Sequence, residues 1–156
     1  MAATSAHRQR QGELGQFLTP APLASFMASM FGPLPEVVRL LDAGAGAGAL
    51  TTAFVSRLCQ KKDGVRSIEA TLYEFDPLIQ DALSKTMLDC QRVCSRAGIQ
   101  FTFAIHSTDF IQEMSSRLAD DLFGAPRPSF DAAITNPPYR KIRMDSHERR
   151  GPFNPT

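Results

Sequence analysis

The feature that most constrains the fold is a short apolar run that leads directly into a glycine-rich loop. The run covers residues 37–42, the loop that follows (43–49) reads AGAGAGA, and residues 50–58 have helical composition. Strand, glycine loop and helix in this order open a nucleotide-binding βαβ unit. Glycines let the backbone approach a ligand closely, and a helix N-terminus presents free N–H groups. The pattern therefore predicts an α/β protein with a mostly parallel sheet.

The residue before the glycines narrows the kind of ligand. No Gly-Lys-Ser/Thr sequence follows the loop, so the loop is not a phosphate-binding P-loop. Asp42 stands immediately before Ala43 and Gly44, where a carboxylate repels a pyrophosphate and suits a ligand with a cationic end. Gly44, Gly46 and Ala49 also satisfy a loose dinucleotide pattern, which is a weak signal. The alternative interpretation is a turn of small residues that binds nothing.

A second acidic residue follows the second predicted strand. Residues 67–73 form that strand, and Glu74 comes directly after it. An acid in this place can accept hydrogen bonds from ribose hydroxyls. Asp76 and Pro77 predict the start of a long helix, because they suit the N-cap and first-turn positions, and Gly98 is expected to close it after about Ala97. Glu74 is thus the ligand candidate and Asp76 a structural residue.

The third predicted strand, residues 99–105, leads to Asp109 and Phe110. One interpretation is that Asp109 accepts a hydrogen bond from an adenine amino group while Phe110 covers the ring. The other is that Asp109 simply caps a helix over residues 111–118. Local sequence supports the two interpretations equally.

The fourth predicted strand, residues 130–135, ends in Asn136-Pro137-Pro138-Tyr139. The Asn136 side chain offers a carbonyl oxygen, the prolines stiffen the loop and lack N–H groups, and Tyr139 adds an aromatic face. Two fixed acceptors beside a flat ring suit a planar molecule that carries an exocyclic NH2 group. The alternative is a Pro-Pro turn that closes the strand, with Tyr139 packed at its rim.

Composition limits the number of domains and the classes of protein to which the chain can belong. A chain of 156 residues with 43% hydrophobic residues suits one domain, and a net charge of +1 gives no overall nucleic-acid signature. Three cysteines without framework spacing indicate buried free thiols in a reducing compartment rather than a metal site or disulfide scaffold. No apolar run is long enough to span a membrane, so we expect a cytoplasmic protein without membrane contact.

The ends of the chain differ from its middle. Residues 1–15 are polar and patternless and predict a mobile arm, whereas residues 140–156 predict a basic, disordered tail. Between them, Thr19 and Pro20 are expected to start a helix over residues 21–31, with Thr19 as its N-cap. One face of that helix is expected to be apolar, and its members are Leu23, Phe26, Met27, Met30 and Phe31.

Five motifs occur in one order: Gln16-Phe17-Leu18-Thr19-Pro20, Asp42-Ala43-Gly44-Ala45-Gly46, Glu74, Asp109-Phe110 and Asn136-Pro137-Pro138-Tyr139. In this order and spacing the chain resembles the N-terminal half of bacterial adenine-N6 DNA methyltransferases, namely restriction–modification enzymes of the Eco57I-like kind. The resemblance implies a doubly wound, Rossmann-like class I methyltransferase sheet, S-adenosylmethionine as cofactor and DNA as substrate. It implies cofactor-binding roles for Thr19, Pro20, Asp42, Ala43, Gly44, Gly46, Glu74, Phe75, Asp109 and Phe110, and catalytic roles for Asn136, Pro137 and Tyr139, without a metal.

The family has a seven-stranded sheet and a recognition region, whereas this chain stops soon after its fourth strand. We therefore expect a cofactor domain over residues 16–139 that is truncated, with doubtful activity alone and a missing C-terminal half or recognition subunit as a partner. Its fourth strand is expected at an exposed sheet edge with uncovered apolar side chains, which predicts marginal stability or self-association. Two alternatives are a protein glutamine N5-methyltransferase, whose target also presents a planar NH2, and a non-catalytic cofactor-binding remnant.

Overall fold

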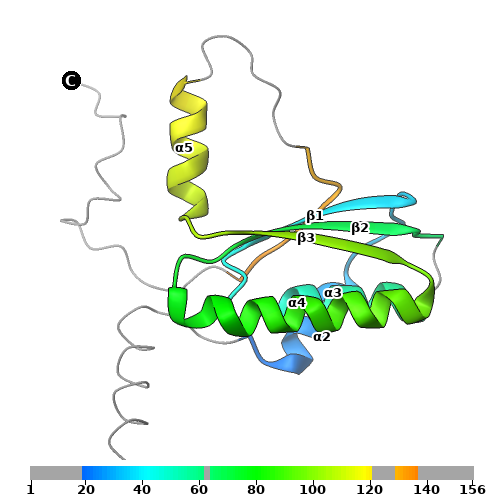
Figure 1. Cartoon of the computed structure of the whole chain (residues 1–156). Coiled ribbons are helices and arrows are strands. Elements are labelled where there is room, and N and C mark those ends of the chain that lie inside the picture. Colours follow the sequence, from blue (N-terminus) through cyan, green and yellow to red (C-terminus); the bar gives the residue numbers. More distant parts are fainter. Residues whose placement is uncertain (1–18, 62–63, 121–128, 137–156) are drawn as a thin grey trace, which may run out of the picture. The chain divides into compact units, whose positions relative to one another are not determined.

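The fold is built on a four-stranded parallel sheet, seen in a computed structural model that describes residues 19–61, 64–120 and 129–136. The strands lie in the order β3-β2-β1-β4 (Figure 1). The chain moves outward from β1 to β3 and then returns to the other side of β1. The strand order therefore reverses between β1 and β4, and ligands of open α/β sheets bind at such reversals. The strand bounds are Val37–Ala43 for β1, Ser67–Tyr73 for β2, Gln100–His106 for β3 and Ala132–Ile134 for β4.

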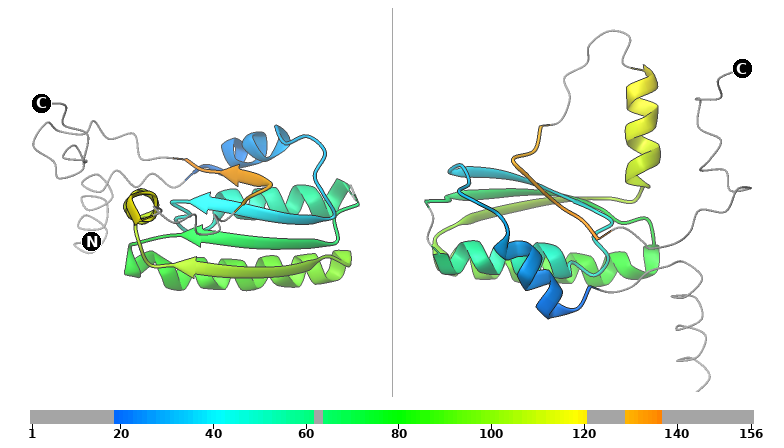
Figure 2. Two further views of the ribbon diagram at one scale, coloured as in Figure 1. Left: turned by 90° about the horizontal axis from the view of Figure 1, so that it is seen from above. Right: turned by 180° about the vertical axis from the view of Figure 1, so that it is seen from behind.

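Helices stand on both sides of this sheet, as a doubly wound fold requires. α3 (Ala49–Lys61) and α4 (Pro77–Ala97) lie along one face, and α2 (Ala21–Ser29) packs against α3 (Figure 1). α5 (Phe110–Asp120) rises on the other side, from the C-terminal end of β3 (Figure 2). The predicted α/β fold class is confirmed.

The boundaries of α4 follow from local signals at its two ends. The Asp76 side chain accepts a hydrogen bond from the Leu78 amide at 2.9 Å, and Pro77 occupies the first turn. At the other end Gly98 adopts a left-handed conformation with φ 76° and caps the helix. These residues stop and start the helix as the sequence predicts, because each satisfies backbone groups that the helix leaves unpaired.

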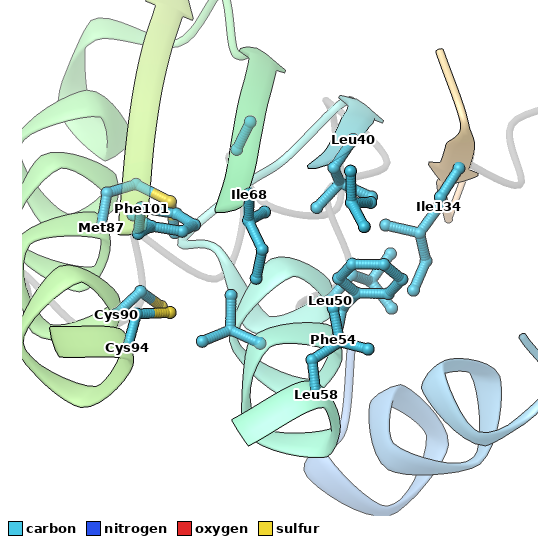
Figure 3. Close-up of a cluster of buried hydrophobic side chains, with 14 of the residues drawn as sticks. Leu40, Leu50, Phe54, Leu58, Ile68, Met87, Cys90, Cys94, Phe101 and Ile134 are labelled. Carbon is cyan, nitrogen blue, oxygen red and sulfur yellow. The ribbon is translucent and has the colours of Figure 1, made fainter. Parts of the chain in front are cut away.

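The core lies between the sheet and the α3–α4 layer. In Figure 3, strand side chains such as Leu40 and Ile68 lie over Phe54 of α3 and Met87 of α4. All four of these side chains are fully buried. The cysteines are free thiols, and burial raises the pKa of Cys94, which lies 3.8 Å from Cys59 between the two Sγ atoms, to about 12. Burial thus favours the neutral thiol over the reactive thiolate.

The expected apolar face of α2 is correct only in part, because Met27 and Phe31 pack against the core but the other three predicted residues do not. Ala24 and Ala28 are the fully buried residues, whereas Leu23, Phe26 and Met30 are 42%, 63% and 71% exposed. Small residues face α3, and they let the two helices approach closely. The helix also ends at Ser29, two residues before the predicted end, and Pro20 rather than Thr19 is its N-cap, without a side-chain capping bond.

Strand β4 is an edge strand among the described residues, because it pairs only with β1. Its predicted uncovered apolar surface is nevertheless absent. Ala132 and Ile134 are 5% and 3% exposed and point into the core, so the small Ala133 is the residue of β4 that faces solvent. The alternation of side chains along a strand explains the difference, since the large Ile134 lies on the covered face together with Ala132.

Several sequence predictions concern residues outside the described ranges. These are the arm (1–15), the tail (140–156), and Pro137 and Tyr139 of the fifth motif. Within the described ranges, no helix is long and apolar enough to cross a membrane. The same ranges contain no cluster of three or more potential metal ligands.

Candidate functional site

The candidate site lies at the C-terminal end of β1, where the chain turns through three glycines into α3. Gly44 and Gly46 have positive φ angles of 89° and 55°, which L side chains rarely adopt. The amides of Gly44 and Ala45 donate to the Tyr73 carbonyl oxygen at 3.0 and 2.9 Å and hold the turn against β2. A Cβ built at Gly44 or Gly46 would meet nothing within 4 Å. The turn is therefore open above these two residues, as a ligand approach requires.

Gly48 has a different role, which its place in the sequence does not indicate. A Cβ there would lie 2.8 Å from Met87 Cε and 3.1 Å from Leu83 Cδ1, in addition to the strain of its φ of 88°. Gly48 thus sets how closely the turn packs on α4. The regular Gly-x-Gly-x-Gly spacing shows three glycines, but it does not show which of them faces another helix.

Asp42 is a fully buried carboxylate with one oxygen satisfied and one free of partners. Its Oδ2 accepts from the Thr51 hydroxyl at 2.7 Å, whereas its buried Oδ1 has no hydrogen-bond partner in the described part of the chain. Burial is the main cause that raises the pKa of Asp42 to about 6, and the Thr51 hydrogen bond opposes it. A buried acceptor without a partner is costly, so a donor or cation that reaches Oδ1 would be strongly favoured.

Both carboxylate oxygens of Glu74 accept hydrogen bonds from backbone amides. Oε2 accepts from the Gly46 amide at 2.9 Å, and Oε1 accepts from the Asp76 amide at 2.8 Å. The side chain is buried, at 5% exposure. Glu74 therefore fixes the glycine turn relative to the end of β2, a structural role that the sequence did not indicate. Its predicted role toward ribose hydroxyls stays a prediction, since each carboxylate oxygen can accept more than one bond.

The Asp109–Phe110 pair lies at the start of α5. Asp109 Oδ1 accepts from the Gln112 amide at 3.0 Å, so Asp109 caps α5 as the second interpretation predicts. The Phe110 ring packs edge-on against Tyr73 at 5.0 Å between centroids. The Tyr73 hydroxyl also donates to Glu113 of α5 at 3.3 Å. These contacts attach α5 to the end of β2, and the adenine-binding role of the pair remains a prediction.

The structure brings Asn136 and Thr19 together, although 117 residues separate them in the chain. The Asn136 Nδ2 donates to the Thr19 Oγ1 at 3.0 Å, and the contact is partly buried. The preceding hydroxyl, Thr135 Oγ1, donates to the Ala43 carbonyl oxygen at 2.6 Å. The ends of β4 and β1 and the segment before α2 thus meet beside the glycine turn. Sequence alone assigned Thr19 and Asn136 to one site by resemblance and did not indicate their contact.

Phe75 and Pro20 complete the described part of the predicted set. Phe75 follows Glu74 and is 53% exposed, so its ring is available to a ligand at the end of β2. The Pro20 carbonyl accepts the first hydrogen bond of α2, from the Ala24 amide at 3.0 Å. A groove of about 560 Å³ between α2, α3 and α4 is lined by Thr19 and Ala47 but by neither Asp42 nor Glu74. It therefore borders the candidate site at Thr19 and at the glycine loop but does not include the two acidic residues.

Similarity to a solved structure identifies the fold. A putative class I S-adenosylmethionine-dependent methyltransferase from Listeria monocytogenes superposes with a TM-score of 0.52 over 80% of this chain and 32% of that chain, at 21% identity. The fold is that of the class I methyltransferases. The glycine turn, Asp42 and Glu74 accordingly lie at the ends of β1 and β2 of a class I methyltransferase sheet.

Two sequence relatives are methyltransferases by name. The chain is 34% identical over 145 residues to the Type II methyltransferase M.BsuBI of Bacillus subtilis, and 32% identical over 139 residues to the Type II methyltransferase M.PstI of Providencia stuartii. The alignments cover 91% and 89% of this chain but 28% and 26% of those proteins. The chain thus spans little more than a quarter of the length of these relatives. No family model matches it.

Proposed function

We propose that this chain carries the cofactor-binding part of an S-adenosylmethionine-dependent DNA methyltransferase that acts on the N6 amino group of adenine. The observation that carries the proposal is the free buried Oδ1 of Asp42 beside an open glycine turn. A ligand with a cationic amino acid end would satisfy that oxygen. The class I methyltransferase fold and the two relatives named Type II methyltransferases support the same assignment.

The described residues fit this cofactor in their chemistry. Asp42 would hold the cationic amino acid end, the open backbone of Gly44 and Gly46 would admit it, and Glu74 would accept from the ribose hydroxyls. The exposed ring of Phe75 would be available to the adenine of the cofactor. When bound, S-adenosylmethionine supplies an electrophilic methyl group on a sulfonium.

Asn136 supports an amino group as the acceptor of the methyl. The nitrogen of an amine conjugated to a purine is a poor nucleophile. A fixed carbonyl oxygen that accepts from its N–H favours the pyramidal nitrogen that can attack, which is stabilisation of the transition state by a preorganised dipole. Pro137 would contribute a second carbonyl oxygen and Tyr139 would stack on the extruded base, as the resemblance implies. A metal ion is not needed for these roles.

Calorimetry with S-adenosylhomocysteine tests the cofactor assignment. The wild-type chain should bind, and Glu74→Gln should weaken binding by about 1–3 kcal/mol, the usual size of a lost hydrogen bond to a charged group. Glu69→Gln, on the exposed face of β2, is the matched control and should bind as the wild type does. A folded wild-type chain that does not bind would overturn the proposal.

Transfer of tritiated methyl groups separates the substrates. Incorporation into adenine-containing DNA that is lost in Asn136→Ala supports the DNA assignment, whereas incorporation into a glutamine-containing peptide supports the glutamine alternative. Because the chain spans about a quarter of its relatives, we expect transfer to DNA to be slow unless the rest of such a protein is supplied. Cofactor binding without any transfer in that combination would support a non-catalytic role.

A further inference from the structure

The orientation of the Asn136 amide decides whether it can act on an amino group. A carboxamide has a donor end, the NH2, and an acceptor end, the carbonyl oxygen. Only the carbonyl oxygen can accept a hydrogen bond from a target amine. If the group were rotated by half a turn about its last bond, two donors would face each other. The proposed function therefore requires something that holds the donor end away from the target.

The Thr19 hydroxyl is in the right place to do this. Its oxygen accepts from Asn136 Nδ2 at 3.0 Å, so the NH2 end of the amide is turned toward the segment before α2. The hydroxyl is not engaged as a helix cap, because the N-cap of α2 is Pro20 and has no side-chain capping bond. Among the described residues, its side-chain hydrogen bond is the one to Asn136.

A second hydroxyl fixes the backbone from which this amide extends. Thr135 donates to the Ala43 carbonyl oxygen at 2.6 Å and so joins the end of β4 to the end of β1. With the backbone held by Thr135 and the NH2 held by Thr19, little rotational freedom is left to the side chain. Side-chain oxygens and amides placed in this way act as preorganised dipoles.

We propose that Thr19 is a positioning residue for Asn136: it holds the amide donor, so that Oδ1 is the group offered at the end of β4. The proposal rests on the proposed function for the identity of the target, which is a planar molecule with an exocyclic amino group. It assigns Thr19 a role distinct from the cofactor contact that the resemblance implies. Serine at position 19 retains the hydroxyl and should still hold the Asn136 amide. Valine has the same shape as threonine but lacks the hydroxyl, so it should not hold the amide.

The side-chain amide signals of asparagine test the contact directly, because the chain contains only two asparagines, Asn136 and Asn154. In the ¹⁵N-asparagine-labelled full chain, the Asn136 NH2 protons should exchange with water about fivefold more slowly than those of Asn154, the effect of one typical hydrogen bond. Thr19→Val should abolish this difference, and Thr19→Ser should retain it. Thr102→Val, the same change at an exposed position of β3, should have no effect.

Adenosine, added to the chain saturated with S-adenosylhomocysteine, tests the acceptor role. It should shift the Asn136 signals in the wild type and in Thr19→Ser. In Thr19→Val, the affinity for adenosine should be about fivefold lower. Equal exchange of the two asparagines in the wild type, or unchanged Asn136 signals in Thr19→Val, would overturn the inference. Failure of S-adenosylhomocysteine to bind overturns the proposed function instead, and leaves the exchange comparison to decide the Thr19 contact.

Discussion

The two faces of the sheet are made of different side chains. The face under α3 and α4 carries buried apolar residues on every strand, among them Leu40, Ile68 and Phe101. The opposite face carries many exposed side chains, such as Arg39 and Glu69, and its buried residues, Leu41 and Tyr73, lie toward the C-terminal ends of β1 and β2. A parallel sheet that is buried on both faces usually has nearly continuous apolar strands. Here β2 and β3 alternate, so hydrophobic stabilisation comes mainly from one side.

This difference indicates which contacts hold the described fold together. The covered face buries large aliphatic and aromatic groups, each of which contributes about 1.5–3 kcal/mol. Substitutions at exposed positions of the opposite face should cost little stability, because those side chains already contact water in the folded protein. The predicted weakness of the β4 edge is reduced for the same reason, since Ile134 points to the covered face and only Ala133 is presented outward.

The largest expected effect comes from a cavity on the covered face. Phe54 of α3 is fully buried, and Phe54→Ala should lower the free energy of unfolding by about 3–5 kcal/mol, the range for such core truncations. Thr102→Ala on the opposite face should change it by less than about 0.5 kcal/mol. Urea denaturation followed by circular dichroism measures both. Similar losses for the two variants would show that the opposite face is also a packed layer.

A smaller effect is expected from the buried carboxylate of Asp42. Its pKa of about 6 lies above the usual 3.8, so between these pH values the folded protein keeps a proton that the unfolded chain releases. Asp42 therefore favours folding fully below pH 4, and this contribution is lost as the pH rises through 6. The loss amounts to roughly 2–3 kcal/mol, at 1.36 kcal/mol for each pKa unit.

Unfolding free energies measured from pH 4 to pH 7 test this dependence. Asp42→Asn should remove the decline, whereas Asp81→Asn, at an exposed position of α4, should keep it. The ligand should show the opposite trend, because a cationic group binds the ionised form of Asp42. Its affinity should rise with pH through 6 in the wild type and not in Asp42→Asn. A wild-type stability that does not decline over this range would contradict the assignment.

The smallest effect is expected at the exposed pair of Arg39 and Asp131. Arg39 donates to both carboxylate oxygens of Asp131, with Nε and Nη2 each at 3.0 Å. These bonds lower the pKa of Asp131 to about 2, so their contribution is present above pH 4 and is lost as the pH falls toward 2. Arg39→Met should lower the melting temperature slightly at pH 7 and not at pH 2. An equal decrease at both pH values would contradict a charge effect.

Local signals explain which elements the sequence predicts well. The limits of α4 depend on Asp76, Pro77 and Gly98, which act through neighbouring backbone groups, and these limits are predicted to the residue. The bounds of β2 agree as well, because its alternation is clear. The buried face of α2 is predicted only in part, because α3 packs most closely on two alanines, Ala24 and Ala28, rather than on Leu23, Phe26 or Met30. A helical pattern cannot show that a neighbouring helix lies too close for a large side chain.

In the candidate site, too, the features that depend on local sequence are predicted and those that depend on tertiary contacts are not. Asp42 and the glycines are recognisable because the turn is continuous in sequence. The bonds of Glu74 to Gly46 and Asp76 arise from the way the chain folds back at the end of β2. The contact between Thr19 and Asn136 joins segments that only the strand order brings together. Such contacts depend on tertiary structure and have no local pattern.

The bonds between Arg39 and Asp131 have a further consequence, which concerns register. A strand of three residues determines its own alignment poorly, yet the Arg39 and Asp131 backbones also bond to one another, from the Asp131 amide to the Arg39 carbonyl at 2.9 Å. A shift of one residue would reverse the faces of β4, expose Ile134 and turn Asn136 away from Thr19. The pair at the start of the strand therefore acts together with burial of Ala132 and Ile134 to fix the register that brings Asn136 to the site. An insertion of one residue between Asp131 and Asn136 would be harmful even if the fold survived.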